Sequence, residues 1–489
     1  MQHFKHYING EFSAGSNHFK SINPANNKPW ATFPAATETE SNHAIESAHK
    51  ALFNGPWANY SATERGKLLH KLGDLIAQNA AILGELETTD SGKLAIETKT
   101  QSSYVADYYY YYAGLADKIQ GEVLPIDKPD MHVFTTREPI GVVVAIVPWN
   151  AQLLLSATKI APALAAGNTV VVKASEQAPA ALFKFAELVD QSGFPPGVVN
   201  VITGFGDPCG RVITSHRHVS KVAFTGGCEV AQNIVRNTAE NFAHVSLELG
   251  GKSPMIIFDD CDIEGAVNAV IAGNFGASGQ SCVAGSRVFI QKSIHKELLA
   301  RLTKRSKTIV IGDPLDSKTQ VGPLATTHQV DRAYNVITNS IKQGAKLVFG
   351  GKKPEHMKVG NYFEPTLLDC PDQSIECTRT EFFAPVVSVI AFETEKEAIQ
   401  MANDSKFGLG AGVFTQNLAR AHRVSQQIRS GIVWINTYRV ISPIAPFGGF
   451  KNSGGSREAG MDAIYEYTRT KTTWISTSTK SMTNPFVIR

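Results

Sequence analysis

Hydrophobic positions in the first hundred residues recur at helical spacing. Ser61 and Glu64 form a capping-box pattern that predicts the start of a helix. The apolar residues that follow share one helical face, and they are Leu68, Leu69, Leu72, Leu75 and Ile76. A second helix is predicted over 104–116, and residues 119–139, which lack a helical period, are predicted to form an extended hairpin.

From residue 140 onward, short β-branched runs alternate with helical segments. The first strands are predicted over 141–147, 169–173, 198–203 and 221–224, with a helix over 179–192 among them. This alternation predicts βαβ units and a parallel sheet covered on both faces. A second α/β set is predicted from helices near 263–273, 295–308 and 329–343 and strands over 287–291, 386–392, 412–414 and 432–435.

The chain length and charge narrow the function classes. A chain of 489 residues is too long for one core, so two or three folded units are expected. The net charge of +3 is spread along the chain and gives no electrostatic case for nucleic acid or a membrane surface. The N-terminus lacks an apolar run, and the longest such run, 141–147, is too short to cross a bilayer, so neither a signal peptide nor a membrane span is expected.

The cysteines of the chain form no CxxC pair and no His/Cys cluster. We therefore expect no disulfide framework and no metal site, and a cytoplasmic location. The six are Cys209, Cys228, Cys261, Cys282, Cys370 and Cys377. Most single cysteines are inert small hydrophobes, but Cys282 has small neighbours on both sides that leave its thiol reachable as a nucleophile.

Two further residues are candidates for acyl chemistry. Glu248 stands between two leucines before a Gly-Gly turn, where partial desolvation would raise the pKa of its carboxyl toward that of a general base. The alternative is an ordinary solvated glutamate at a strand end. Asn150 follows the apolar strand and Val147-Pro-Trp, where its amide could donate to an oxyanion, although an asparagine there is commonly only a turn residue.

Glycine turns after two strands are candidates for binding a dinucleotide. The turn over 204–210 lacks the GxGxxG spacing, whereas the turn over 224–229 leads into a helix whose free N–H groups favour a pyrophosphate. Lys173 and Glu176 end a neighbouring strand and suit ribose hydroxyls. The Glu176 carboxylate would repel a 2′-phosphate, which favours NAD over NADP.

The order of these segments along the chain resembles the aldehyde dehydrogenase superfamily from end to end. The matching segments are Ile8–Glu11, Pro148–Asn150, Lys173–Glu176, Phe224–Gly226, Glu248–Lys252, Gly279–Cys282, Glu381–Pro385 and Pro446–Lys451. Glu-Leu-Gly-Gly-Lys and Gly-Gln-x-Cys are the most specific of them. The resemblance implies an α/β fold with a variant Rossmann cofactor domain over 1–118 and 140–250, an α/β catalytic domain over 251–450, and a small β oligomerisation arm and tail over 119–139 and 472–489.

The resemblance also implies an activity, the NAD-dependent oxidation of an aldehyde to the carboxylic acid. Cys282 would form a thiohemiacetal and then a thioester, with the oxyanion held by Asn150 and the Cys282 N–H. Glu248 would activate the hydrolytic water, and Lys159 matches a lysine of the catalytic set. The implied cofactor contacts are Val147, Pro148, Trp149, Lys173, Ser175, Glu176, Gly206, Gly210, Phe224, Thr225, Gly226, Gly227, Leu249, Gly250, Glu381 and Phe383.

Three positions depart from the family pattern near the cofactor. Gly227 replaces a serine, Ala231 replaces a glycine, and Ala384 replaces the glycine of Glu-x-Phe-Gly-Pro. Each substitution could alter the binding of NAD, but none removes a catalytic group.

The substrate pocket is expected to be roomy, because small or aliphatic residues stand at several of its positions. Its predicted wall is Tyr104, Tyr108, Ala151, Leu155, Thr158, Ser281, Val283, Arg439 and Ile441. Arg439 could hold a substrate carboxylate and so favour a semialdehyde, or it could be a surface arginine or part of an intersubunit ion pair.

Two other functions are possible for a chain with this resemblance. A CoA-acylating aldehyde dehydrogenase would pass the thioester to a thiol, but a base at Glu248 favours hydrolysis. A structural or binding protein on the same fold would have no need of the cysteine, base and oxyanion donor together. We expect a homodimer or homotetramer acting on a small-molecule aldehyde, either medium-sized or carboxylate-bearing, whose identity the sequence leaves open.

Overall fold

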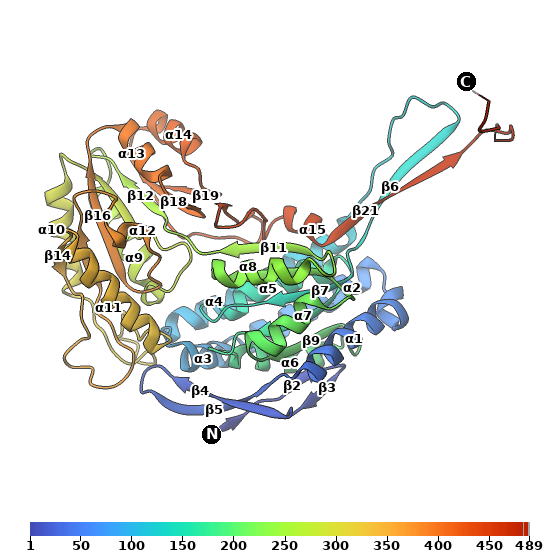
Figure 1. The fold of residues 1–489 in the computed structure, drawn as a ribbon, viewed down its shortest axis with the longest axis horizontal. Coiled ribbons are helices and arrows are strands. Elements are labelled where there is room, and N and C mark those ends of the chain that lie inside the picture. Colours follow the sequence, from blue (N-terminus) through green and yellow to red (C-terminus); the bar gives the residue numbers. More distant parts are fainter. Residues whose placement is uncertain (483, 488–489) are drawn as a thin grey trace.

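The computed structural model describes residues 1–482 and 484–487. Two α/β lobes lie side by side, and a two-stranded ribbon projects from one of them (Figure 1). Of the predicted arm and tail over 472–489, residues 483, 488 and 489 lie outside the described residues. No helix in the described part of the chain is both long enough and apolar enough to cross a membrane.

The first lobe is built on a seven-stranded sheet. Its order is β11 (His244–Leu249), β10 (Val219–Gly226), β7 (Val142–Ile146), β8 (Thr169–Ala174), β9 (Val199–Thr203), β2 (His6–Ile8) and β3 (Glu11–Ser13). The first five strands run parallel, and the N-terminal hairpin of β2 and β3 adds antiparallel to β9. Strands β7 to β9 are buried almost throughout, as expected of a parallel sheet that helices cover on both faces.

Eight helices belong to this lobe. They are α1 (Glu38–Asn54), α2 (Ala62–Gln78), α3 (Ala80–Ser91), α4 (Ala95–Leu115), α5 (Gln152–Ala165), α6 (Ala180–Ser192), α7 (Arg211–Ser215) and α8 (Cys228–Thr238). The predicted capping box of Ser61 and Glu64 is present at the start of α2. Helix α4 begins at Ala95, nine residues before the predicted start at 104. A small sheet of β1 (Gln2–His3), β5 (Lys28–Ala35) and β4 (Asn17–Asn23) completes the lobe.

The second lobe carries another seven-stranded sheet. Its order is β14 (Lys346–Phe349), β15 (Thr366–Asp369), β16 (Val386–Phe392), β13 (Arg287–Gln291), β12 (Pro254–Ile257), β18 (Gly410–Phe414) and β19 (Ile432–Ile435). Alternate residues of these strands enter two separate cores: Val386 and Ile390 belong to one, and Val387 and Val389 to the other. This alternation follows from the two-residue period of a strand, and it places one core on each face of the sheet.

Most of the remaining elements of the second half belong to the second lobe, and the last helix, α15, returns the chain to the first lobe. The helices are α9 (Ile263–Phe275), α10 (His295–Ser306), α11 (Thr327–Lys342), α12 (Glu376–Arg379), α13 (Glu395–Asn403), α14 (Leu418–Gln427) and α15 (Asp462–Glu466), and the short pair is β17 (Phe407–Gly408) with β20 (Phe450–Lys451). Ala463, Ile464 and Tyr467 pack into the core of the first lobe.

The predicted hairpin over 119–139 is present between 122–124 and 133–135, but its second strand pairs mainly with a distant segment. Strand β6 (Met131–Pro139) pairs antiparallel with β21 (Thr468–Ser476) along its whole length, and these two strands form the projecting ribbon (Figure 1). The local hairpin lies around the bridge between Val123 and Phe134, where Leu124 N–H donates to the Val133 carbonyl at 2.9 Å and Thr135 N–H donates to the Glu122 carbonyl at 2.8 Å. The longer pairing, with β21, joins segments more than 300 residues apart in the sequence, where no local turn pattern could indicate it.

Candidate active site

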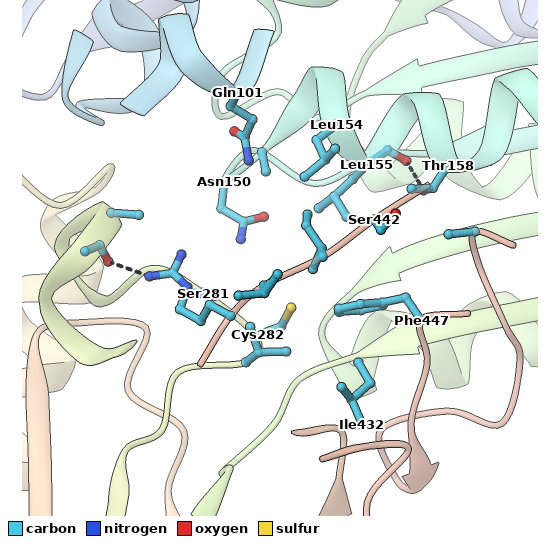
Figure 2. Close-up of a pocket in the computed structure, with 18 of the residues that line it drawn as sticks. Gln101, Asn150, Leu154, Leu155, Thr158, Ser281, Cys282, Ile432, Ser442 and Phe447 are labelled. Carbon is cyan, nitrogen blue, oxygen red and sulfur yellow. Dashed lines mark hydrogen bonds between the residues drawn. The ribbon is translucent and has the colours of Figure 1, made fainter. Parts of the chain in front are cut away.

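A cavity of about 500 Å³ opens between the two lobes and contains Cys282 and Asn150 on its wall. Figure 2 shows both side chains there, with Leu154, Leu155 and Phe447 supplying apolar surface. The predicted wall residues Tyr108, Ala151, Leu155, Thr158, Ser281, Val283, Arg439 and Ile441 all line it. Tyr104 instead lines an adjacent hollow, where its hydroxyl donates to the carbonyl of Ile441 at 3.1 Å.

Cys282 stands on a tightly folded loop. Ala277 and Ser278, just before it, adopt positive φ values of 52° and 54°. A Cβ on Gly279 would lie 2.3 Å from the carbonyl oxygen of Ala384, and one on Gly251 would lie 2.5 Å from that of Cys282. The glycines of Gly-Gln-x-Cys and Glu-Leu-Gly-Gly-Lys are therefore required by close backbone approach.

The thiol of Cys282 is protonated at rest. Burial, together with the nearby Glu381 and Glu248, raises its pKa to about 12, and Arg439 opposes this shift. Only the thiolate is a strong nucleophile. Attack by Cys282 therefore needs a base or an added positive charge in the cavity.

Asn150 is held in place by the loop that carries Cys282. Its side-chain Nδ2 donates to the carbonyl of Gln280 at 3.0 Å, and the residue is 8% exposed. A primary amide has two N–H donors. One fixes the orientation of the side chain, and the other is available to a bound oxyanion.

Glu248 lies in β11 with its side chain buried. Neither carboxylate oxygen has a hydrogen-bond partner among the described residues. Burial raises the pKa of this carboxyl well above its usual range, Glu458 raises it further, and Lys159 lowers it. A carboxyl with a raised pKa and no competing donor suits a general base near neutral pH.

Lys159 belongs to a buried network that the sequence did not reveal. Its Nζ donates to Thr225 Oγ1 at 2.6 Å and to the carboxylate of Glu458. Thr158 Oγ1 donates to the other oxygen of Glu458 at 2.7 Å. Glu458 therefore neutralises Lys159, and it also lines the cavity. Nothing in the sequence around Glu458 marked it, because its partners lie about 300 residues away.

Most of the predicted cofactor residues gather at the carboxyl ends of neighbouring strands of the first lobe, whereas Glu381 and Phe383 lie in the second lobe before the start of β16. At or just after the end of β7 lie Val147, Pro148 and Trp149, and at the end of β8 lie Lys173, Ser175 and Glu176. After β9 come Gly206 and Gly210, and around the end of β10 lie Phe224, Thr225, Gly226 and Gly227. The end of β11 carries Leu249 and Gly250. The edge formed by the carboxyl ends of parallel strands is where open α/β sheets bind dinucleotides. The side chains of Val147 and Phe224 are buried in the core of the first lobe, so only their backbones are available to a ligand.

The chemistry of this edge fits NAD. Lys173 Nζ lies 3.3 Å from Glu176 Oε2, which offers a cation and a carboxylate for ribose hydroxyls. Glu381 accepts a hydrogen bond from the Gly251 N–H at 2.9 Å. A Cβ on Gly206 or Gly227 would meet no atom within 4 Å, so both glycines border open space that a pyrophosphate can fill.

The departures from the family pattern take different positions. Gly227 borders this open space, whereas Ala231 is 2% exposed and packs into the first core. Ala384 is 4% exposed, and its carbonyl approaches Gly279. Of the three, only Gly227 lies where a side chain would face a ligand.

Several polar residues of the cavity were missed from the sequence. Lys93 Nζ contacts Glu87 at 3.0 Å and Gln101 at 2.7 Å. Glu97 accepts from the Ala277 N–H at 2.8 Å, and its second oxygen is buried without a partner among the described residues. These side chains come from α4 and the turn before it, where no motif indicated a functional role.

Arg439 lines the cavity, and its positive charge lowers the pKa of the Cys282 thiol. Its φ is +65°, and its Nη1 donates to the carbonyls of Ala272 at 3.0 Å and Gly276 at 3.4 Å. Within the described residues no carboxylate lies within 4.0 Å of its guanidinium. The carbonyls orient the side chain and leave its charge without a protein counter-ion.

A separate cluster of Glu46, His216 and His218 has the composition of a metal site. His216 Nδ1 accepts from the His218 N–H at 3.1 Å, so its Nε2 carries the proton that faces Glu46 at 3.3 Å. A neutral imidazole in this tautomer has no free lone pair for a metal. We therefore describe the cluster as a network of hydrogen bonds and charges.

Comparisons with known proteins agree with this geometry. The family model for the aldehyde dehydrogenase family matches residues 12–473. The (Z)-2-((N-methylformamido)methylene)-5-hydroxybutyrolactone dehydrogenase of Acinetobacter baylyi is 55% identical over 100% of both chains. Aldehyde dehydrogenase 1A1 of Mesocricetus auratus is 40% identical over 98% of this chain and 96% of its own. The crystal structure of betaine aldehyde dehydrogenase from Staphylococcus aureus in complex with NAD+ superposes with a TM-score of 0.97 at 38% identity, covering 99% of this chain and 97% of that one.

Proposed function

This chain belongs to the aldehyde dehydrogenase family, and we propose that Cys282, Asn150 and Glu248 carry out its NAD-dependent oxidation of an aldehyde to the carboxylic acid. The observation that carries this assignment is the shared cavity of Cys282 and Asn150, with the unpartnered Glu248 carboxylate close enough to affect the Cys282 thiol.

The first half of the reaction takes place at Cys282. Its sulfur adds to the aldehyde carbonyl, and the resulting oxyanion accepts hydrogen bonds from the free N–H of the Asn150 amide and from the Cys282 backbone. Because the Gln280 carbonyl fixes the amide beforehand, little reorganisation is needed as the charge develops. The C=O bond then re-forms as a hydride leaves the same carbon, which gives the Cys282 thioester. NAD, when bound, would accept that hydride, and its positive ring would favour the Cys282 thiolate.

Glu248 and Asn150 then act on the thioester. The Glu248 carboxylate accepts a proton from a water molecule as the water adds to the thioester carbonyl. Asn150 again donates to the oxyanion, and collapse releases the carboxylic acid and the Cys282 thiol. A base at this position distinguishes hydrolysis from transfer to CoA, which would need no such base. If acyl-CoA were the major product when CoA is added, the hydrolytic role of Glu248 would be wrong.

For the cofactor, we assign the ribose contacts to Lys173, Glu176 and Glu381. The ion pair of Lys173 with Glu176 supports binding of the adenosine ribose, and the Glu176 carboxylate opposes a 2′-phosphate. Glu381, which the Gly251 N–H holds, supports a contact with the second ribose. Lys159 is assigned to the charge network with Glu458 rather than to direct contact with the substrate.

We propose that the substrate is an aldehyde with a carboxylate. Arg439 supports this, because it is a cation on the cavity wall that lacks a protein counter-ion among the described residues. The Acinetobacter baylyi relative is named for a 5-hydroxybutyrolactone. In general, a 5-hydroxylactone of this kind opens to a 4-oxo acid, which has an aldehyde at one end and a carboxylate at the other. A guanidinium is the side chain best suited to such a carboxylate.

Three small aldehydes of different charge test this proposal. NADH formation is measured with 4-oxobutanoate, butanal and betaine aldehyde, which carry negative, neutral and positive charge. We expect the highest kcat/KM for 4-oxobutanoate and the lowest for betaine aldehyde. Arg439→Ala should lower kcat/KM for 4-oxobutanoate by about 10- to 100-fold more than for butanal, the worth of a charge-assisted hydrogen bond. The loss with butanal reports only the effect of Arg439 on the Cys282 thiol.

Arg429→Ala is the matched control, because Arg429 is exposed and does not line the cavity. It should leave all three substrates unchanged. Equal loss with butanal and 4-oxobutanoate in Arg439→Ala, or no preference for 4-oxobutanoate in the unmodified enzyme, would remove the carboxylate from the proposal.

We also propose that the chain forms a homodimer or homotetramer through its ribbon. Strands β6 and β21 project from the body and expose Met131, Trp474 and Ile475. An isolated two-stranded ribbon with apolar residues in water is only marginally stable, and a second copy could cover it. Light scattering of the intact protein measures the assembly.

A reducing cytoplasm remains our prediction, and all six cysteines are free in the structure.

A further inference from the structure

Two cysteines of the second lobe lie in contact with each other, away from Cys282. Cys370 follows directly on β15 and Cys377 lies in α12, and their Sγ atoms are 3.4 Å apart. Both side chains are buried, at 4% and 0% exposure. They stand only seven residues apart, so the segment between them forms a short loop closed by the two sulfurs.

We propose that Cys370 and Cys377 are a modification site, at which a peroxide joins the two sulfurs in a disulfide. The Cys377 thiolate attacks one peroxide oxygen, the O–O bond breaks, and Cys377 becomes a sulfenic acid while the other oxygen leaves as water. The Cys370 sulfur then attacks the Cys377 sulfur and releases the second water. Overall, two thiols lose two electrons and two protons, and the peroxide is reduced to two molecules of water.

The surroundings of the pair assign the attacking role to Cys377. The hydrogen bond that it shares with Cys370 lowers the pKa of the Cys377 thiol, and burial opposes this shift. Ser388, Ser340 and Lys252 lower that pKa further. Lys252 is 1% exposed, and its Nζ has no hydrogen-bond partner among the described residues. Burial lowers the pKa of Lys252 to about 7, and Cys377 is the neighbour that most opposes this shift. A thiolate at Cys377 would give the buried ammonium its missing counter-charge.

Formation of the disulfide would shift the chain toward the proposed cofactor site. The sulfurs must close from 3.4 Å to about 2.05 Å. β15 is held on both edges by β14 and β16, whereas α12 is a single turn, so α12 should make most of the movement. Glu381 lies two residues beyond the end of α12, where it accepts the hydrogen bond from Gly251. We therefore expect oxidation to weaken NAD binding, a consequence that rests on the proposed role of Glu381.

The test uses a Cys282→Ser chain, so that oxidation of Cys282 cannot contribute. The protein is treated with hydrogen peroxide, the remaining thiols are blocked, and the chain is cut with trypsin. No lysine or arginine lies between Lys358 and Arg379, so both cysteines fall in the one peptide 359–379. We expect this peptide to become two hydrogens lighter and to regain its mass on reduction with dithiothreitol. Because both thiols are buried, the rate should level off at high peroxide, where local opening limits the reaction.

Affinity for NAD, measured by calorimetry on the same samples, is the second readout. Oxidation should raise the Kd for NAD several-fold, and reduction should restore it. Cys370→Ser and Cys377→Ser should each abolish the response, whereas Cys261→Ser, at a half-buried cysteine outside the pair, should retain it. The mass measurement on the Cys282→Ser chain needs neither pair variant, so it holds even if these fold poorly.

Two results would overturn the inference. One is a peptide 359–379 that keeps both thiols, or gains oxygen instead of losing hydrogens, while other cysteines are oxidised. The other, a disulfide that forms without any change in the Kd for NAD, would refute the link to Glu381. Neither result depends on whether 4-oxobutanoate is a substrate, so this test fails separately from that of the proposed function.

Discussion

Glu458 is the charged neighbour that adds most, after burial itself, to the raised pKa of Glu248. The same Glu458 carboxylate binds Lys159, which acts on Glu248 in the opposite direction. The proton affinity of the proposed base is therefore set by a carboxylate and an ammonium that themselves form a buried pair.

Glu458→Gln should move the pH dependence of thioester hydrolysis toward acid. The substitution removes a negative neighbour and leaves Lys159 with an uncompensated positive charge, and both changes lower the pKa of Glu248. A general base works in its deprotonated form, so the rate rises as pH increases through that pKa. The rising limb should shift down by roughly one pH unit, the size typical of one nearby charge. Single-turnover hydrolysis measured across pH gives the limb directly.

Glu248→Gln is the control for this shift, since it should abolish both the limb and most of the hydrolysis. Removing one partner of a buried pair also destabilises the fold, so the thermal midpoint of Glu458→Gln is measured alongside. A limb that stays in place in a folded Glu458→Gln variant would show that Glu458 does not tune the base.

Asn150→Ala should lower kcat by about 10²- to 10³-fold, the typical cost of losing one oxyanion donor. Asn150→Asp keeps the size of the side chain but replaces the donor with an acceptor, so it should lose at least as much. Because the amide acts on the oxyanion and not on the aldehyde, KM should change little in either variant. Steady-state NADH formation with a saturating aldehyde measures the effect. A large increase in KM with kcat retained would place Asn150 in substrate binding instead.

Gly250→Ala should weaken NAD binding through Glu381. A Cβ at residue 250 would lie 2.1 Å from Glu381 Oε2, so the carboxylate must move and lose its 2.9 Å hydrogen bond from Gly251. The displaced carboxylate should then lose its proposed hydrogen bond with the NAD ribose. A hydrogen bond to a charged group is worth about 1.5–3 kcal/mol, so this loss should raise the Kd for NAD about tenfold or more. Calorimetric titration with NAD measures this change.

Gly114→Ala is the matched control, because Gly114 is an exposed residue of α4 outside the predicted cofactor contacts, and a Cβ there would meet no atom within 4 Å. It should change the Kd for NAD much less than Gly250→Ala does. In a Glu381→Ala background, Gly250→Ala should cause no additional loss. An additional loss in that background would mean that Gly250 acts on NAD by another route.

The sequence predicts best those elements that are buried on both faces. The strands Arg287–Gln291 and Val386–Phe392 begin and end where the apolar runs predicted, because a strand inside a parallel sheet is apolar along its length. The β arm over 119–139 and the tail over 472–489 were expected only from the family resemblance, and the pairing of β6 with β21 was not predicted because it joins distant segments. Pairing of that kind leaves no periodic or turn signal in either segment.

The candidate site divides in the same way. Cys282, Asn150 and Glu248 stand in short segments with recognisable neighbours, and the structure brings Cys282 and Asn150 to one cavity. Glu97 and Glu458 stand in ordinary helical or loop sequence and enter the cavity only through tertiary packing. Charge networks that join distant segments therefore cannot be predicted from local sequence patterns.

The contact between Lys159 and Glu458 also orders events during synthesis. A ribosome must add 299 further residues after Lys159 before the carboxylate that neutralises it exists. Until then the lysine has no counter-ion in the core it is meant to enter, and contacts this distant in sequence form slowly. A nascent chain should therefore remain incompetent for aldehyde oxidation until Glu458 has emerged, close to the end of synthesis.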